Sequence, residues 1–459
     1  MGENMVLKNK SVLIIGMGKS GISSAKLCSR LGADVTIYDS KASNHFTEMI
    51  DAHTDYGFKY VFGEFEDRLL DINQYMILSP GVPTSLSFIE KAKRADQKIK
   101  VIGEIELAYC FGSGNIIGIT GTNGKTTTTT LVGEIVKLTQ DNTYVVGNIG
   151  IPYTDIADLT RDDDMIVIEL SSYQLEAVET FRPKVSCILN LTEDHLQRHI
   201  TMENYGLTKL NITKNQDESD WCILNNMDEF CRSYASKIKA KVIWFSTKEK
   251  VQGVYVKGGL ILSNIKGKDQ EVMKTSDIPV LGEHNVENVL AAIAMCQVVD
   301  IPMSVIIAGI KAFKGVAHRN EFVVEIDGVR YYNDSKATNP DAAIKAIEAM
   351  DRPTILLAGG MDKDSDYTAW IKTFQEVIKT IVLYGETAEM IATACRINDF
   401  DRILIADGFE DAVIKASKLA RPGYNVLLSP ACASWDMFPN FEVRGDLFKE
   451  IVFGIKQKL

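Results

Sequence analysis

Residues 118–130 read GITGTNGKTTTTT and place Lys125 between a glycine and a row of five threonines. Threonine is a poor helix former and glycine weakens both helices and strands, so this run is unusual for a purely structural segment. A short apolar run precedes it, and its glycines expose backbone N–H groups that can surround a phosphate. Lys125 would contact the β- and γ-phosphates, and the Thr126 hydroxyl would bind Mg²⁺. The segment therefore predicts an ATP-binding turn between a strand and a helix.

The match to the strict phosphate-loop pattern is incomplete. Ile119 stands five residues before Gly124, where that pattern has a glycine, although Gly118 and Gly121 flank the position. The core TGTNGKT still supplies backbone donors, a lysine, a hydroxyl and a helix N-terminus directed at the nucleotide. The predicted ATP-binding residues of the turn are Gly121, Thr122, Asn123, Gly124, Lys125, Thr126 and Thr127.

A second glycine-rich turn lies near the start of the chain. Residues 16–21 (GMGKSG) form a full G-x-G-x-x-G between the apolar run 11–15 and a helical pattern ended by Gly32, and Asp39 follows the next apolar run. Such a turn lets the backbone approach a diphosphate, and the acid can bind a ribose hydroxyl. The pattern alone favours NAD, so an oxidoreductase is one hypothesis; a tight turn without a ligand is another.

Two polar residues follow strands near the predicted ATP-binding turn. Glu169 ends the apolar run of residues 164–170, and His195 follows the apolar run 184–191. Because parallel strands end at one edge of a sheet, both could lie near Lys125. Glu169 could hold Mg²⁺ directly or through water, and His195 could bind a metal or orient a phosphate. Taken singly, a solvated loop acid and a structural histidine would explain them as well.

Short apolar strands alternate with helical patterns along the whole chain. A patchier, β-rich stretch covers residues 217–280, and GVAHRNEF (315–322) marks a junction before a further β/α series. This alternation predicts an α/β protein with mainly parallel, doubly wound sheets. The 459 residues are too many for one core. We expect a Rossmann-like domain over 1–110, a central phosphate-loop ATPase-like domain over 111–316 and a C-terminal Rossmann-like domain over 317–459.

Composition and charge exclude several classes of function. The net charge of −11 argues against a nucleic-acid partner, and no apolar run is long enough to span a membrane. The N-terminus lacks the features of a secretory signal. Eight scattered cysteines without a C-x-x-C pair indicate neither a disulfide framework nor a thiolate metal site. We expect a cytoplasmic, monomeric protein with neither a nucleic-acid nor a membrane partner.

Further motifs resemble the bacterial Mur ligases, amide-bond-forming enzymes of peptidoglycan synthesis. The resemblance covers nearly the whole chain through TGTNGKTT, GNIG (147–150), ELSSYQLE (169–176), TEDHL (192–196), GEHNVEN (282–288) and AHRNE (317–321). GMGKSG, NDSKATNP (333–340) and SPACASWDMF (429–438) are similar to the branch that adds D-glutamate to UDP-N-acetylmuramoyl-L-alanine. The resemblance implies an ATP-dependent ligase that works through an acyl phosphate and a tetrahedral intermediate.

The resemblance also implies which residues bind each ligand. The UDP-containing substrate would contact Gly18, Lys19, Ser20, Asp39, Ser40, Ser79, Gly81 and Asn148. In addition to the ATP-binding turn, ATP would contact Asn285, Asn288, Arg319, Asp334 and Lys336. D-Glutamate would bind to Thr338, Lys363, Ser434 and Phe441. In GGMDK (359–363), Met361 replaces an acid that related enzymes commonly show, and Asp362 could take its place.

Catalysis would depend on Lys125, Asn148, His195 and Lys209. A lysine at position 209, in a segment of helical spacing, would by default be a solvated surface residue, but the resemblance places it beside Mg²⁺ as a carbamate. A buried lysine can lose its proton and take up CO₂, and the carbamate supplies the hard oxygen ligands that Mg²⁺ prefers. Two Mg²⁺ ions are expected, with ligands from Thr126, Glu169, His195 and carbamylated Lys209.

Hypotheses from other classes remain open at this point. An NAD-dependent oxidoreductase explains residues 16–21 but leaves TGTNGKT without a role. A non-catalytic nucleotide switch uses TGTNGKT but leaves the last β/α series without one. Within the resemblance, the nearest alternative is a sibling ligase that adds another amino acid.

Overall fold

The computed structural model describes residues 5–94, 98–280, 282–362, 365–374 and 377–457. The chain forms two compact units, one of Met1–Asp277 with Glu287–Lys311 and the other of Ile278–Val286 with Ala312–Leu459. Three sheets of five, nine and six strands organise the described residues. The predicted α/β class with mainly parallel sheets is confirmed. The predicted domain boundaries after residues 110 and 316 stay predictions.

The first sheet is entirely parallel, with strand order β3-β2-β1-β4-β5. Its central strand β1 reads SVLII, and successive residues pack into different cores on the two faces: Val12 and Ile14 on one, Leu13 and Ile15 on the other. Helices on both faces explain why the strand is continuously apolar. The strands are β1 (Ser11–Ile15), β2 (Asp34–Asp39), β3 (Lys59–Phe62), β4 (Tyr75–Leu78) and β5 (Lys100–Gly103), and the helices are α1 (Lys19–Arg30), α2 (Thr47–Asp51), α3 (Arg68–Ile72), α4 (Ser87–Ala92) and α5 (Glu104–Phe111).

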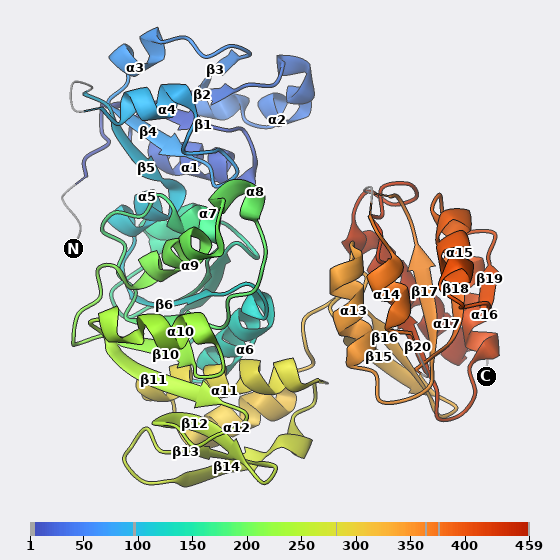
Figure 1. Ribbon diagram of the computed structural model, residues 1–459. Helices are drawn as coiled ribbons and strands as arrows, with labels where there is room; N and C mark the ends of the chain where they lie inside the picture. The colour runs from blue at the N-terminus through green and yellow to red at the C-terminus, as the bar shows by residue number, and fades with distance from the viewer. Residues whose placement is uncertain (1–4, 95–97, 281, 363–364, 375–376, 458–459) are drawn as a thin grey trace. The chain divides into compact units, whose positions relative to one another are not determined.

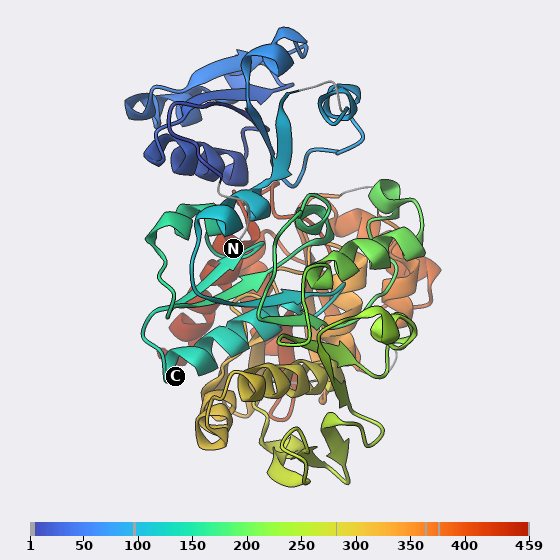
Figure 2. The same cartoon turned by 90° about the vertical axis from the view of Figure 1, so that its left-hand side faces the viewer.

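The second sheet of the same unit has the order β14-β13-β12-β11-β10-β9-β6-β8-β7. Strands β6 to β12 pair in parallel, whereas β12, β13 and β14 pair antiparallel. The patchy stretch of the sequence is therefore an edge extension of this sheet. Figures 1 and 2 show the two sheets as separate layers of the first unit, with α5 at their junction. The strands are β6 (Asn115–Thr120), β7 (Thr143–Gly147), β8 (Met165–Glu169), β9 (Val185–Ile188), β10 (Trp221–Asn225), β11 (Lys241–Ser246), β12 (Gly253–Lys257), β13 (Leu260–Ser263) and β14 (Gln270–Lys274).

Seven α-helices of the described residues lie between the strands of this sheet, or after its last strand, in the sequence. They are α6 (Lys125–Lys137), α7 (Ser172–Leu175), α8 (Leu196–His199), α9 (Met202–Leu210), α10 (Glu229–Tyr234), α11 (Glu283–Val298) and α12 (Met303–Ala312). The short helices α7, α8 and α9 follow strands β8 and β9 directly, and α6 follows β6. The residues at the carboxyl ends of these strands therefore meet at one edge of the sheet.

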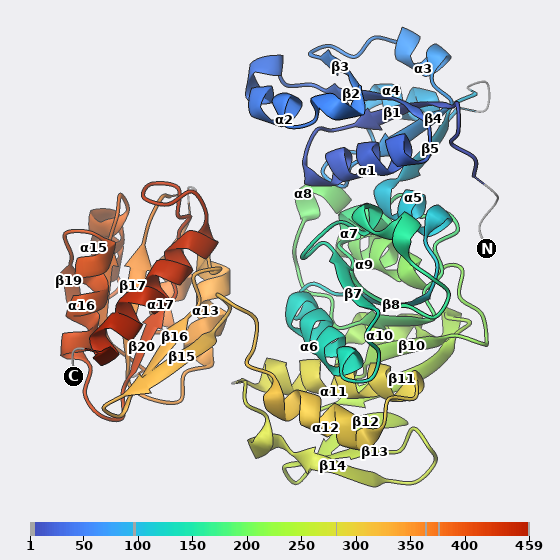
Figure 3. The same cartoon turned by 180° about the vertical axis from the view of Figure 1, so that it is seen from behind.

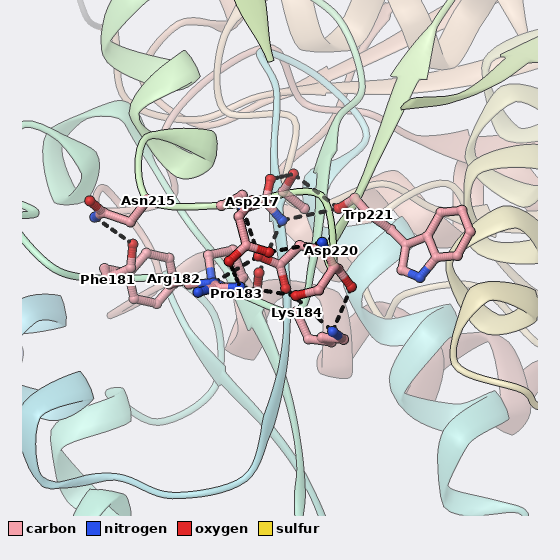
Figure 4. Close-up of polar contacts among 11 residues, drawn as sticks. Phe181, Arg182, Pro183, Lys184, Asn215, Asp217, Asp220 and Trp221 are labelled. Atoms are coloured by element: carbon pink, nitrogen blue, oxygen red, sulfur yellow. Dashed lines mark hydrogen bonds and ion pairs between the residues drawn. The ribbon is translucent and has the colours of Figure 1, made fainter. Parts of the chain in front are cut away.

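A polar cluster holds the opposite, amino ends of β9 and β10 together (Figure 4). Asp220, whose side chain is 3% exposed, accepts a 2.7 Å hydrogen bond from Nε of Arg182 and lies 3.5 Å from Nζ of Lys184. Asp217 pairs with the same guanidinium at 2.6 Å, and Nδ2 of Asn215 donates to the carbonyl of Phe181. The cluster lies at the end of the strands opposite to their carboxyl ends, where the predicted site residues are, so we assign it a structural role.

The sheet of the second unit has the order β15-β16-β20-β17-β18-β19, with an antiparallel pair at the β15 edge and parallel pairs elsewhere. Helices α13, α14 and α15 cover one face of this sheet, and α16 and α17 cover the other (Figures 1 and 3). Buried side chains of each group of helices form a separate core with the strands. The strands are β15 (Glu321–Ile326), β16 (Val329–Asn333), β17 (Thr354–Gly359), β18 (Ile378–Tyr384), β19 (Ile403–Ile405) and β20 (Asn425–Leu428), and the helices are α13 (Pro340–Glu348), α14 (Thr368–Lys372), α15 (Ala388–Ile397), α16 (Phe409–Leu419) and α17 (Phe441–Gln457).

Two expectations about the chain as a whole can be compared with the structure. In the part of the chain that the structure describes, no helix is both long enough and apolar enough to span a bilayer. All eight cysteines are free, and seven of them are buried.

Candidate active site

The predicted ATP-binding turn lies between β6 and α6. Gly121 (φ +154°) and Gly124 (φ +81°) turn the chain, and a Cβ on Gly124 would lie 2.2 Å from Oδ1 of Asn288. Helix α6 begins at Lys125 and directs its first N–H groups into the turn. Nζ of Lys125 donates hydrogen bonds to the carbonyl oxygens of Gly121 and Thr122, at 2.9 and 2.8 Å. The backbone cradle and the lysine that phosphate binding requires are therefore both in place.

Lys209 lies in α9 and is only 1% exposed. Its Nζ donates a 2.8 Å hydrogen bond to the carbonyl of Gly121 and lies 4.5 Å from the centre of the Tyr205 ring. Burial, assisted by the positive charge of Lys125, lowers the pKa of Lys209 to about 6. At pH 7 the amine is therefore largely neutral and nucleophilic, which is the state that carbamate formation requires. The alternative of a solvated surface lysine is wrong.

Glu169 ends β8, which lies beside β6 in the sheet, and is 1% exposed. Its Oε1 accepts a 2.7 Å hydrogen bond from Nδ2 of Asn148. Its Oε2 is buried and has no hydrogen-bond partner among the described residues. A buried carboxylate oxygen without a partner is energetically costly, and a bound cation would remove that cost. The geometry fits the prediction that Glu169 binds Mg²⁺.

His195 follows β9 and adopts a left-handed conformation, with φ of +54°. Its Nδ1 lies 3.1 Å from the hydroxyl oxygen of Tyr173. Burial lowers the pKa of His195; Asp194 opposes this effect, whereas Lys125, and Lys209 in its protonated form, add to it. The imidazole is therefore neutral near pH 7 and able to bind a metal or accept a hydrogen bond.

Lys125, Glu169, His195 and Lys209 thus lie in one electrostatic neighbourhood. Thr126 joins them at the start of α6. Within the described ranges, no three His, Cys, Asp or Glu side chains come together as a ready-made metal site. A cation here would need phosphate or carbamate oxygens beside the protein ligands. Mg²⁺ commonly binds in this way, through one or two carboxylates and substrate phosphates.

A cavity of ≈ 450 Å³ lies between the first and second sheets. The G-x-G-x-x-G turn and the segment after β4 form one side of it, and the segments after β7 and β8 form the other. The lining residues are Gly16, Met17, Gly18, Lys19, Ser20, Asp39, Ser79, Pro80, Gly81 and Val82 from the first side, and Gly147, Asn148, Gly150, Pro152 and Gln174 from the second. All of the predicted contacts of the UDP-containing substrate lie on its wall, except Ser40.

The polar groups of this cavity hold its two sides in place. Oδ2 of Asp39 accepts a 2.9 Å hydrogen bond from the backbone N–H of Met17, and Oδ1 accepts one from the N–H of Lys41. Nζ of Lys19 donates to the carbonyl of Gly150, 2.6 Å away, on the opposite side. Asp39 therefore orders the glycine-rich turn in addition to its predicted role toward a ribose.

In the second unit, Asp334 follows β16 and is buried. It accepts hydrogen bonds from the hydroxyl of Ser429 at 2.8 Å and from the N–H of Asn320 at 3.0 Å. Burial raises the pKa of Asp334 to about 7, although these hydrogen bonds and the nearby Arg319 lower it in part. Nε of Arg319 is itself buried and has no partner among the described residues. The two predicted ATP-binding residues Arg319 and Asp334 are thus neighbours.

Of the predicted D-glutamate residues, Thr338 and Ser434 lie on two loops of the second unit, and Phe441 begins α17. Nζ of Lys336 lies 5.6 Å from the centre of the Phe441 ring, and Thr338 follows two residues later in the same loop. Ser434, on the other loop, is 2% exposed. The two loops are joined by Arg444 of α17, as described below. Lys363 lies outside the described residues.

Met361 and Asp362 have distinct positions. Met361 pairs with Ala433 through two backbone hydrogen bonds and is 39% exposed. Oδ1 of Asp362 accepts hydrogen bonds from the hydroxyl of Tyr367 at 3.0 Å and from the N–H of Ser365 at 3.3 Å. Asp362 therefore orders its own loop, and whether it also replaces the usual acid stays a prediction.

Comparison with known proteins identifies the family. A UDP-N-acetylmuramoylalanine--D-glutamate ligase of Alkaliphilus metalliredigens is 46% identical over 456 residues, which cover 99% of this chain and 100% of that protein. The enzyme of the same name from Clostridioides difficile is 47% identical over 455 residues, covering 98% and 100%. Three family models match in order: the Mur ligase MurD-like N-terminal domain over 10–103, the Mur ligase middle domain over 119–296 and the Mur ligase glutamate ligase domain over 318–432. The chain belongs to the Mur ligase family.

A solved structure agrees with this fold. A MurF from Acinetobacter baumannii, 17% identical, matches 95% of this chain and 93% of its own with a TM-score of 0.61. As a Mur ligase, the protein is an ATP-dependent enzyme that forms an amide bond in peptidoglycan precursor synthesis. The roles of its individual residues are not tested by these comparisons and stay predictions.

Two residues of this Mur ligase were missed by the sequence-based predictions. Gln174 lines the cavity, and its place inside ELSSYQLE was a signal that could have been used. Arg444 is fully buried; its guanidinium donates to the backbone carbonyls of Ser335 at 2.9 Å and of Cys432 at 3.2 Å, which joins the loop of Asp334 to that of Ser434. No local pattern distinguishes this arginine from others in a surface helix.

Asn288 and Asn285 of the Mur ligase stand on the same helix, α11. Oδ1 of Asn288 accepts a 3.2 Å hydrogen bond from the hydroxyl of Thr128, beside the ATP-binding turn. Asn285 belongs to the segment Ile278–Val286, which groups with the second unit. That either residue contacts adenine stays a prediction.

Proposed function

We propose that this Mur ligase joins D-glutamate to the alanyl carboxylate of UDP-N-acetylmuramoyl-L-alanine, with conversion of ATP to ADP and phosphate. The observation that carries this assignment is the ≈ 450 Å³ cavity between the first and second sheets. It combines a diphosphate-binding turn with Asn148, which is hydrogen bonded to Glu169 beside the ATP-binding turn. A substrate whose UDP group occupies the cavity can extend its acyl end along this wall toward Lys125.

The reaction follows from the weak electrophilicity of a carboxylate. The alanyl carboxylate attacks the γ-phosphorus of ATP, the bond to the β-phosphate oxygen breaks, and ADP leaves. The amine of D-glutamate then attacks the acyl carbon and loses a proton. The tetrahedral intermediate collapses with loss of phosphate, which leaves an amide. Lys125 offsets charge on the transferred phosphoryl group, so the protein acts mainly by positioning and electrostatics.

Mg²⁺ fits the residues of this site. Oε2 of Glu169, the hydroxyl of Thr126 and the neutral imidazole of His195 are the groups that would hold it, and two ions are proposed. When bound, Mg²⁺ offsets the negative charge of the phosphate oxygens. The unpartnered, buried Oε2 of Glu169 supports the proposal.

Lys209 is proposed to carry a carbamate. A neutral, buried amine can add CO₂ and release one proton, and the product has a negative charge where an ammonium would be repelled by a cation. The support is its 1% exposure and the lowering of its pKa to about 6. The carbamate would serve as a further oxygen ligand.

The second unit is proposed to supply the remaining contacts. Thr338, Lys363, Ser434 and Phe441 would bind D-glutamate, and Asn285, Arg319, Asp334 and Lys336 would bind ATP. The support within the structure is that Arg444 joins the two loops that carry four of them, namely Asp334, Lys336 and Thr338 on one and Ser434 on the other. The oxidoreductase and the nucleotide switch lose their basis, because full-length relatives are named as ligases.

A coupled assay tests the proposed function. Purified protein is incubated with ATP, Mg²⁺ and UDP-N-acetylmuramoyl-L-alanine, and phosphate release is measured with D-glutamate, L-glutamate, L-alanine, L-lysine or no amino acid. We expect sustained release only with D-glutamate, and a product whose mass equals both substrates minus water. Phosphate release with one of the other amino acids but not with D-glutamate would contradict the assignment.

Variants of two lysines on one helix test the ATP-binding turn. Lys125→Ala removes a charge from the phosphates and should lower kcat about 100-fold or more. Lys137→Ala, in the last turn of the same helix and exposed, is the matched control and should remain near wild-type activity. Equal activity of the two variants would contradict the role of Lys125.

A further inference from the structure

Arg198 lies behind the cavity wall and touches three separate parts of the site. Its Nη2 donates a 2.9 Å hydrogen bond to the carbonyl of Val82, which lines the cavity from the first sheet. Its Nε and Nη2 also donate to the two carboxylate oxygens of Glu176, at 3.0 and 2.7 Å. The two side chains are only 15% and 12% exposed. Such a bidentate, largely desolvated pair has a well-defined geometry.

Glu176 extends this connection. Its Oε2 accepts a second hydrogen bond from the hydroxyl of Thr84, at 3.3 Å. Thr84 and Val82 belong to the segment after β4, whereas Glu176 lies two residues after Gln174, which lines the other side of the cavity. Arg198 and Glu176 therefore hold together two walls that come from different sheets, and the separation of these walls sets the width of the cavity.

The guanidinium also reaches the reacting end of the site. It lies 5.0 Å from the centre of the Tyr173 ring, and the hydroxyl of Tyr173 is 3.1 Å from Nδ1 of His195. A cation over an aromatic ring is attracted to it and restrains its orientation. Arg198 thus connects the wall of the cavity, through Tyr173, to His195.

We propose that Arg198 is a positioning residue that sets the width of the UDP-substrate cavity and, through Tyr173, fixes the position of His195 relative to that cavity. The proposal rests on the proposed function, because it takes the occupant of the cavity to be the UDP-containing substrate. Arg198 does not itself line the cavity. Its removal should therefore weaken binding of that substrate and slow the reaction, with little effect on ATP.

A second arginine offers a matched control. Arg30 of α1 also makes a bidentate pair across the two sheets, with Asp158 at 2.8 and 2.6 Å. It also donates to a backbone carbonyl of the opposite side, that of Thr154 at 3.3 Å. Neither Arg30 nor Asp158 lines the cavity. Loss of Arg30 removes a similar set of contacts but leaves the walls at Val82 and Gln174 in place.

The experiment compares Arg198→Met, Arg198→Lys and Arg30→Met with the wild-type enzyme. Isothermal titration with UDP-N-acetylmuramoyl-L-alanine in the absence of ATP gives the Kd of this substrate. Steady-state assays give kcat and the KM values for this substrate and for ATP. For both Arg198 variants we expect Kd to rise about tenfold or more and kcat to fall about tenfold or more, because a single ammonium cannot replace the three-way contact. KM for ATP should stay within about twofold, and Arg30→Met should change neither Kd nor kcat by more than about twofold.

The outcomes separate the two proposals. If the wild-type enzyme does not bind UDP-N-acetylmuramoyl-L-alanine, the proposed function is wrong and this inference falls with it. If the wild type binds but Arg198→Lys and Arg198→Met bind and turn over equally well, only the inference is wrong. Equal losses in Arg30→Met would also overturn it, since they would reflect general loosening between the sheets. A thermal unfolding transition of each variant shows whether it is folded. If Arg198→Met does not fold, Arg198→Lys, which keeps the positive charge, carries the test alone.

Discussion

The side-chain amine of Lys209 donates a 2.8 Å hydrogen bond to the backbone carbonyl of Gly121, the first residue of the ATP-binding turn. The two residues are 88 positions apart in the chain, and the contact fixes α9 against the end of β6. It places a buried amine with a pKa lowered to about 6 beside Lys125, Glu169 and His195. A buried lysine at such a place is better explained by chemistry than by stability, because burying an amine is costly.

Substitution of Lys209 should abolish acyl-phosphate formation. We expect Lys209→Ala to lower kcat about 100-fold or more, because it removes the proposed carbamate. Acetate at high concentration should restore part of the activity, since its carboxylate can occupy the space of the missing group. Lys214→Ala, an exposed lysine five residues further on, is the control and should remain active. A fully active Lys209→Ala enzyme would show that the carbamate is not required.

Two glycines of the G-x-G-x-x-G turn at residues 16–21 should respond differently to substitution. A Cβ on Gly18 would meet no atom within 4 Å, and Gly18 has an extended backbone (φ −81°, ψ −175°) that any residue can adopt. Gly18→Leu should therefore fold normally but occupy the cavity, and KM for the UDP-containing substrate should rise more than about tenfold while KM for ATP hardly changes. A Cβ on Gly21 would lie 1.9 Å from the carbonyl oxygen of Gly16. Gly21→Ala should therefore lower the melting temperature, in contrast to Gly18→Leu. Loss of ATP affinity in Gly18→Leu would contradict the assignment of the cavity.

Two buried glutamates of α5 should show opposite effects. Glu104 accepts one hydrogen bond, from Nε2 of Gln174, and its Oε2 has no partner among the described residues, so burial raises its pKa to about 7. Between pH 4.5 and about 7 the folded state binds more protons at Glu104 than the unfolded state does, so stability falls as pH rises through this window. Glu104→Gln should remove this loss, of about 3 kcal/mol, and be at least as stable as the wild type at pH 8.

Glu106, two residues further on, is the matched control. Its carboxylate accepts hydrogen bonds from the N–H groups of Glu179, Thr180 and Phe181 and from the hydroxyl of Thr180. Glu106→Gln places an amide NH₂ among these donors and should destabilise the protein by about 2–3 kcal/mol at pH 8. Thermal unfolding of both variants at pH 5 and pH 8 decides the matter. If Glu104→Gln lost as much stability at pH 8 as Glu106→Gln does, the ionised Glu104 carboxylate would not destabilise the folded state.

The backbone at Ile200 should be strained. Ile200 has φ +69° and ψ −45°, and the N–H of Thr201 donates to the carbonyl of His199 at 2.8 Å, so the three residues form a γ-turn of the strained type. Ile200 is 73% exposed, so its side chain contributes little packing. Ile200→Gly should relieve the strain and raise the stability by about 1 kcal/mol, even after the entropic cost of glycine.

A helical isoleucine provides the comparison. Ile397, at the end of α15, is 75% exposed, and Ile397→Gly should lower stability because glycine is a poor helix former. The melting temperatures of the two variants should therefore move in opposite directions. A decrease in Ile200→Gly would mean that the isoleucine side chain stabilises the turn by contacts that outweigh the strain.

The local features of this protein could be predicted from its sequence. The apolar runs, the glycine positions and the alternation of strand and helix patterns determine the three α/β parts and the two glycine-rich turns, because these features depend on backbone sterics and on periodicity over a few residues. The residues at the strand ends could be predicted to converge for the same reason, since parallel strands end at one edge.

The properties that depend on burial were decided only by the tertiary structure. The sequence shows Lys209 as one lysine in a helical segment, and only its packing against Tyr205 and Gly121 makes its amine neutral. Likewise Arg198 and Arg444 are ordinary charged residues in the sequence, yet each joins segments that are more than 100 positions apart or that come from different sheets. Desolvation and charge pairing depend on which distant segments surround a group, and no local pattern records that.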